Sequence, residues 1–220
     1  MLNWLTKTFS SSIGKKYLVA ASGLALVGFL IVHLAGNLTL FADADGSAFD
    51  AYAHALEANP LLPLAEIALA GLFAGHIALA ITVSMQNREA TTQRYRVRTT
   101  LGRATPASRS MIVTGILLLV FLVIHLWDFR IQAMFNGWTD GTLAGMVKTR
   151  LSSPIGMVIY SVGSILVGVH LSHGIRSTFQ SLGVHHPRFQ PLLRNGGIAL
   201  AVLLGLGFLS FPIVVFFFWS

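Results

Sequence analysis

Five long apolar stretches constrain this chain more than any other feature of its sequence. They span Lys16–Phe41, Leu62–Met85, Ser110–Trp127, Ile155–Ile175 and Gly196–Trp219. Each is close to the roughly 20 residues that an α-helix needs to cross a bilayer. Only 10% of the 220 residues are charged, whereas a soluble domain has roughly 25%. We therefore expect an all-α integral membrane bundle of five transmembrane helices, forming a single domain over residues 1–220.

Basic residues are unevenly distributed between the segments that connect these stretches. Twelve of the 15 lysines and arginines lie in the N-terminal segment, between the second and third stretches, and around the connection between the fourth and fifth. The other three, Arg130, Lys148 and Arg150, share their segments with most of the acidic residues. Because basic loops stay in the cytoplasm, we expect a cytoplasmic N-terminus and an external C-terminus. This one-sided distribution accounts for the net charge of +7 without nucleic acid as a partner.

The chain has no cysteine, which excludes disulfides, thiolate-bound iron–sulfur clusters and c-type haem attachment. Any redox centre therefore needs nitrogen or oxygen ligands. Glu66 and Asp128 both lie near the expected outer surface, whereas a translocating carrier usually has acids or broken helices at the midplane. The spans are rich in glycine, which indicates either close helix packing or room for a flat macrocycle. The glycines concerned are Gly23, Gly28, Gly36, Gly71, Gly75, Gly115, Gly163 and Gly168.

Four of the five stretches each contain a histidine: His33, His76, His125 and His170. At a rise of about 1.5 Å per residue, His33 lies about 25 Å from the cytoplasmic start of its span and His125 about 24 Å. Both are therefore near the outer face. The second and fourth spans run the other way, and His76 and His170 lie only twelve and six residues before the basic residues that follow them. The four histidines thus form an outer pair and an inner pair.

A histidine in hydrocarbon is costly and is a functional-site hypothesis by default. A lone one is more often a packed or hydrogen-bonded core residue, but four at matched depths are harder to explain in that way. Two facing imidazoles on separate helices of a bundle are what bis-histidine ligation of haem b requires. The sequence therefore predicts two haem b sites stacked across the membrane. A transporter that uses histidines as a proton relay is the alternative from a different class.

Short motifs in a fixed order carry a resemblance that covers nearly the whole chain. They are Val32–Asn37, Ala65–Ile67, Gln86–Arg88, Val123–Trp127, Leu151–Pro154, His170–Gly174 and Phe179–Gly183. With five spans, this set resembles the cytochrome b subunit that anchors succinate dehydrogenase and fumarate reductase, in its five-helix, two-haem form. Some members of that family have an acidic residue two positions before the fourth ligand. Gly168 stands there in this chain, so we expect no proton path through that position.

The resemblance implies that His33 and His125 ligate the distal haem and that His76 and His170 ligate the proximal one. It implies a flavoprotein and an iron–sulfur subunit docked on the cytoplasmic face of a prokaryotic cytoplasmic membrane. Electrons would pass between the iron–sulfur subunit and a membrane quinone, commonly menaquinone in two-haem members, in either direction. The subunit alone would not bind succinate. The alternatives are the cytochrome b of a hydrogenase or formate dehydrogenase, and an inert anchor with degenerate haem sites.

Several other side chains are weaker candidates. His173 lies one turn from His170 and competes with it, but its headgroup depth favours His170 as the ligand. We expect haem propionate or quinone contacts, or ordinary interfacial roles, from His173, Arg176, Arg130, Glu66 and Asp128. The remaining histidines are expected in loops and not as ligands: His54, His185 and His186.

Overall fold

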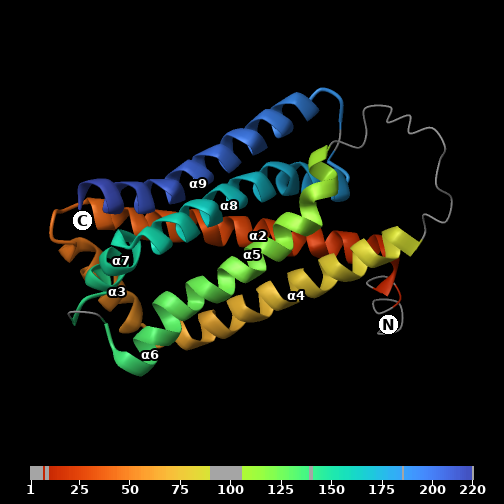
Figure 1. Cartoon of the computed structure of the whole chain (residues 1–220). Coiled ribbons are helices and arrows are strands. Elements are labelled where there is room, and N and C mark those ends of the chain that lie inside the picture. The colour runs from red at the N-terminus through yellow and green to blue at the C-terminus, as the bar shows by residue number, and fades with distance from the viewer. Residues whose placement is uncertain (1–6, 8–9, 90–105, 139–140, 185, 220) are drawn as a thin grey trace.

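The computed structural model describes residues 7, 10–89, 106–138, 141–184 and 186–219, and this part of the chain is helical without a β-strand (Figure 1). Its long helices are α2 (Ser12–Leu38), α4 (Leu62–Glu89), α5 (Pro106–Leu126), α8 (Pro154–Ser181) and α9 (Gln190–Phe218). Within these residues, five helical stretches are long and apolar enough to cross a membrane. The expected all-α architecture with five candidate spans is confirmed.

The observed spans are longer than the apolar stretches of the sequence. They cover Ser12–Phe41, Leu62–Asn87, Ser110–Asn136, Pro154–Ser181 and Gln190–Phe218. The largest error concerns the third span, which we expected to end at Trp127. The chain there continues as the π-helix η2 (Trp127–Ile131) and then as α6 (Gln132–Asn136). Hydropathy falls at Asp128 and Arg130, but both side chains are paired within the protein, so the helix does not need to end there.

Three further short elements lie at the end of the first span or between the spans. They are η1 (Thr39–Phe41), α3 (Ser47–Glu57) and α7 (Leu143–Ser152). His54 therefore lies in a helix, and our assignment of it to a loop was wrong. Asp43 stabilises the start of α3, because its carboxylate accepts hydrogen bonds from the backbone N–H groups of Gly46 and Ala48. Such local capping leaves a weaker sequence signal than a membrane span does.

Side-chain caps also fix where two other helices begin. The Thr142 hydroxyl accepts a hydrogen bond from the backbone N–H of Gly145 at 2.9 Å, at the start of α7. The Ser153 hydroxyl accepts one from the N–H of Gly156 at 3.0 Å, at the start of α8. Pro154 follows at the first helical position, where its missing N–H has no helical partner to lose. A short sequence at the junction therefore ends α7 and starts the span α8.

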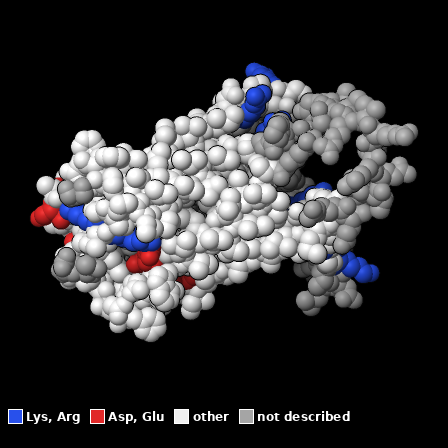
Figure 2. Space-filling view, in the orientation of Figure 1, with Lys and Arg blue, Asp and Glu red and all other residues white. Residues whose placement is uncertain are grey.

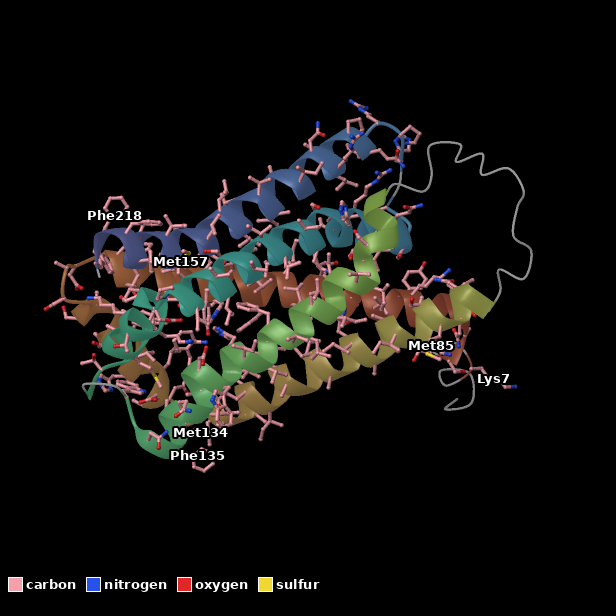
Figure 3. All side chains as sticks on the ribbon, viewed as in Figure 1. Lys7, Met85, Met134, Phe135, Met157 and Phe218 are labelled. Carbon is pink, nitrogen blue, oxygen red and sulfur yellow. The ribbon has the colours of Figure 1, made fainter. Side chains whose placement is uncertain are left out.

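The two ends of the bundle differ in charge and in structure. We call the end where α2 and α9 begin and α4 and α8 end the basic end, and the opposite end, formed by α3, α6 and α7, the capped end. Lys7 and Met85 lie at the basic end, and Met134, Phe135 and Phe218 lie at the capped end (Figure 3). In Figure 2, coloured charged groups gather at the two ends and the surface between them is uncharged. Arg94, Arg96, Arg98 and Arg103 lie outside the described residues.

The helices pack with α8 at the centre, against α2, α5 and most closely α9. Gly168 and Gly205 permit the close approach of α8 and α9, since a Cβ atom on Gly205 would lie 3.1 Å from the Gly168 Cα. Helix α4 lies at the edge of the bundle against α2, and its most apolar window has no buried residue. Apolar side chains exposed along such a helix match a surface that faces lipid.

Candidate functional site

Residues of the predicted inner pair project from α4 and α8, and each contacts a hydroxyl on a neighbouring helix. The Nδ1 atom of His76 lies 3.0 Å from the Oγ of Ser22 on α2. The Nδ1 atom of His170 lies 3.1 Å from the Oγ1 of Thr114 on α5. A Cβ atom on Gly23, beside His76, would also lie 4.0 Å from the Oγ1 of Thr178 on α8, so α2, α4 and α8 meet here. Four helices thus contribute to one cluster near the basic end of the bundle.

The hydroxyl groups determine which imidazole nitrogen carries hydrogen. Ser22 has one O–H, which donates to the backbone carbonyl of Leu18 at 2.7 Å. The O–H of Thr114 is within 3.1 Å of the carbonyls of Ser110 and Met111 on its own helix. Because each O–H has a backbone acceptor, the hydroxyl oxygen is left to accept from the imidazole Nδ1–H. Both inner imidazoles then keep a free lone pair on Nε2, the form of histidine that binds a metal ion.

Two glycines lie directly against these imidazoles. A Cβ atom on Gly23 would lie 3.2 Å from the Cε1 of His76, and one on Gly115 would lie 3.5 Å from the Cε1 of His170. The contact at Gly23 is tight, so glycine there lets the His76 ring approach α2, whereas the contact at Gly115 is an ordinary van der Waals distance. In both cases a hydroxyl residue followed by glycine lies beside an inner histidine.

Close packing and free space each account for some of the glycines in the spans. Gly36 packs against Tyr52, Gly163 against Phe121 and Gly168 against α9, so these serve helix contacts. Nothing lies within 4 Å of a Cβ atom placed on Gly71 or Gly75. These two line a groove of about 370 Å³ between α2 and α4 whose wall includes Ser22 and His76. The two explanations that the sequence left open therefore apply to different glycines.

The predicted outer pair lies toward the capped end. The His33 ring on α2 and the His125 ring on α5 have their centroids 5.8 Å apart and their planes at 89°. Two imidazole nitrogens bound on opposite sides of one metal ion, each about 2 Å from it, would place the ring centroids roughly 6 Å apart. Among the residues that the structure describes, no group of three or more histidines and acids can hold a metal ion.

Aromatic side chains surround the outer pair. Phe29 stacks on His33 at 5.3 Å, and Phe129 and Tyr160 lie 5.4 Å and 6.0 Å from the His125 ring. The Nδ1 atom of His125 is buried and has no hydrogen-bond partner. Such an atom normally costs about 1–3 kcal/mol. The outer pair therefore differs from the inner pair, whose Nδ1 atoms both have hydroxyl partners.

Asp128 follows His125 in the π-helix η2 and forms a network at the capped end. Its Oδ2 accepts from the Nε of Arg150 at 2.7 Å and from the hydroxyl of Tyr160 at 2.9 Å. The Asp128 side chain is only 13% exposed, so the network joins η2, α7 and α8 away from solvent. π-Helical turns are frequent at functional sites. This π-helical turn begins directly after α5, the helix that carries His125.

The other candidate side chains are also placed by the structure. Arg130 donates to Glu66 at 2.8 Å, an ion pair that joins η2 to the N-terminal part of α4. Neither side chain of this pair is therefore free, as it stands, to bind a propionate. Arg176 is exposed at the basic end. The His173 ring makes long contacts, of 3.4 Å and 3.5 Å, with the hydroxyl of the adjacent Ser172.

The sequence reasoning missed Ser22 and Thr114, although a signal for them exists. Residues 22–34 and 114–126 align without gaps and share six identities, which are Gly23/Gly115, Leu26/Leu118, Phe29/Phe121, Leu30/Leu122, His33/His125 and Leu34/Leu126. In both segments a hydroxyl residue precedes the histidine by eleven positions. Eleven residues make three helical turns, about 16 Å, and so return to the same helix face. Each of α2 and α5 therefore supplies a hydroxyl to the inner pair and an imidazole to the outer pair.

Comparisons with family models, curated proteins and solved structures gave no match to this chain. What can be inferred about its function therefore depends on the two histidine pairs and their surroundings.

Proposed function

We propose that this chain is the dihaem cytochrome b membrane-anchor subunit of a succinate:quinone oxidoreductase. It would pass electrons between an iron–sulfur subunit and a membrane quinone, with its N-terminus in the cytoplasm of a prokaryote. The observation that carries the proposal is the arrangement of four histidines as two pairs, each drawn from two helices, at two depths of one bundle. The dehydrogenase partner and the menaquinone substrate rest on the family resemblance of the motifs.

The residues present fit two haem b groups. His76 and His170 would hold one, since both have a free Nε2, and His33 and His125 would hold the other. A haem iron with two imidazole ligands supplies reversible one-electron transfer. The open space beside Gly71 and Gly75 next to His76 supports room for a flat ring system. Phe29 and Phe129 make the surroundings of the outer pair apolar.

Charge pairing supports the proposed orientation. All three basic residues at the capped end have partners within the chain: Arg130 with Glu66, Arg150 with Asp128, and Lys148 with two backbone carbonyls and the Trp219 ring. Within the described residues, the two ion pairs of the chain are both at this end. A basic end with few acids is the end that stays in the cytoplasm, where the flavoprotein and iron–sulfur subunits would dock.

The first test is a visible spectrum and a haem assay of the purified protein. We expect two haems b per chain with the absorption of bis-imidazole haem. His76→Leu and His125→Leu should each remove one haem, and His54→Leu, in α3, is the matched control that should keep both. A wild-type protein without haem ends the proposal and favours a transporter with a histidine relay. Unchanged haem content in both variants rules out these ligands.

The second test concerns the partner and the substrate. The chain should co-purify with a flavoprotein and an iron–sulfur protein, and the complex should reduce a menaquinone analogue with succinate as the donor. Replacing His76 should abolish quinone reduction and leave succinate oxidation by a soluble dye acceptor intact, because the flavoprotein performs that step. Co-purification with a hydrogenase or a formate dehydrogenase instead would retain the cytochrome and refute the succinate assignment.

A further inference from the structure

Hydrogen bonding distinguishes the two histidine pairs more sharply than their depth does. The Nδ1 atoms of both inner imidazoles lie at hydrogen-bond distance from a hydroxyl oxygen, Ser22 for His76 and Thr114 for His170. The backbone acceptors of the two hydroxyls favour Nδ1–H as the donor in both contacts. His76 also hydrogen-bonds the backbone of Val19, on the same helix as Ser22. In the outer pair, by contrast, the Nδ1 atom of His125 is buried without a hydrogen-bond partner among the described residues. The difference arises although α2 and α5 each contribute to both pairs.

We propose that Ser22 and Thr114 are positioning residues that fix the tautomer of the inner imidazoles and tune their strength as electron donors. This inference rests on the proposed function, because the electrons would be donated to haem iron. The hydroxyls do so without touching the iron or the quinone. Their own O–H groups are held by backbone carbonyls of the same helix, so each oxygen is oriented toward its imidazole before any ligand binds.

A hydrogen bond from the distant nitrogen raises the basicity of a metal-ligating imidazole and fixes its ring orientation. A more basic imidazole favours the ferric over the ferrous iron, since the oxidised ion carries more positive charge. Losing the acceptor should therefore raise the midpoint potential of the inner haem only. If the preference for ferric iron falls about tenfold, the potential rises by about 59 mV for a one-electron couple. Loss of such a partner also weakens metal binding by about 10–100-fold.

The experiment is a potentiometric titration of the purified complex in detergent, followed by visible absorption. The variants are Ser22→Ala and Thr114→Val. The matched controls are Thr82→Val and Ser210→Ala, because these hydroxyls also donate to a carbonyl of their own helix, at 2.8 Å and 2.7 Å, without an imidazole partner. We expect the potential of one haem to rise in each test variant, with the other haem unchanged. Both potentials should stay at their wild-type values in the controls.

A second set of variants covers the case in which Ser22→Ala or Thr114→Val loses the inner haem altogether. Ser22→Thr and Thr114→Ser keep the hydroxyl and should restore both the haem and its potential. Hydroxyl-retaining variants that behave like the hydroxyl-free ones would overturn the inference, as would potentials that do not move or that move equally in both haems. If the wild-type protein binds two haems but the midpoint potentials of the variants do not shift, only this inference is refuted. A wild-type protein with no haem refutes the proposed function as well.

Discussion

The unpartnered nitrogen of His125 predicts that two similar substitutions have opposite effects on the stability of the haem-free protein. We compare His125→Leu with His170→Leu. Both remove an imidazole from a long helix and put an apolar side chain of similar size in its place. They differ in what the imidazole did before: the Nδ1 of His125 is buried without a partner, whereas the Nδ1 of His170 donates to Thr114.

The expected magnitudes follow from these two environments. Removing a buried polar atom that has no partner relieves a penalty of about 1–3 kcal/mol. Removing one side of a made hydrogen bond costs about 0.5–1.5 kcal/mol. Other losses, such as contacts of the ring with its neighbours, affect both substitutions and largely cancel in the comparison. We therefore expect His125→Leu to be more stable than His170→Leu by about 1.5–4.5 kcal/mol.

The assay is reversible unfolding of the haem-free protein in mixed detergent and lipid, measured by loss of helical circular dichroism as SDS is added. The protein is expressed under haem limitation, so that ligand binding does not contribute to the free energy of unfolding. A His125→Leu variant that is as unstable as His170→Leu, or less stable, would show that the outer imidazole has a partner and that the reasoning is wrong. The same His125→Leu protein should lack one haem when expressed with haem present.

Three further predictions concern the ends of the bundle and its helix contacts. Asp128→Ala should destabilise the protein by about 3–5 kcal/mol, because it leaves the largely buried Arg150 without its ion-pair partner. Glu66→Ala should cost only about 0–1 kcal/mol, because both side chains of that ion pair are 40% exposed or more. Equal losses of stability in SDS unfolding would contradict the argument from burial. Gly156→Ala should break the junction of α7 and α8, since its Cβ would clash with the Arg150 carbonyl oxygen. Gly28→Ala, whose added Cβ has nothing within 4 Å, should be neutral or stabilise the protein by up to about 1 kcal/mol. Thermal unfolding in detergent would show this difference. The pKa of Asp43 is held below its usual value, chiefly by the hydrogen bond from the Ala48 backbone N–H. The stabilisation of α3 by the Asp43 carboxylate should therefore be complete above about pH 4 and be lost as the pH falls further. Amide hydrogen exchange in α3 should show this acid dependence, and Asp43→Asn should remove it.

Hydropathy predicted the five candidate spans of this molecule, but not its polar contacts. The five spans could be predicted because a helix that crosses a bilayer needs about 20 consecutive apolar residues, and these five stretches have about that length. The third span was cut short at Trp127, since single residues give no sign that Asp128 and Arg130 find partners 22 and 64 positions away. The contacts of Ser22 and Thr114 depend on which face each helix turns toward its neighbours, and a calculation of depth from the rise per residue gives no information on that. The repeat of residues 22–34 in 114–126 carries that information and was available in the sequence.

Accounting for the polar groups within the spans separates structural from functional histidines more clearly than depth alone. Polar side chains in a membrane are expensive unless they are paired. Asp128, with Arg150 and Tyr160, is paired within the protein. The inner imidazoles have an acceptor for Nδ1–H and keep a free lone pair on Nε2, so their remaining bonding capacity points away from the hydroxyls. The outer imidazoles have even less compensation, since His33 and His125 contact mainly aromatic rings. Glu66 and Asp128 are each paired with an arginine, whereas the four imidazoles of the spans form no ion pair within the described part of the chain, and this contrast supports our proposal that each histidine pair binds a metal centre.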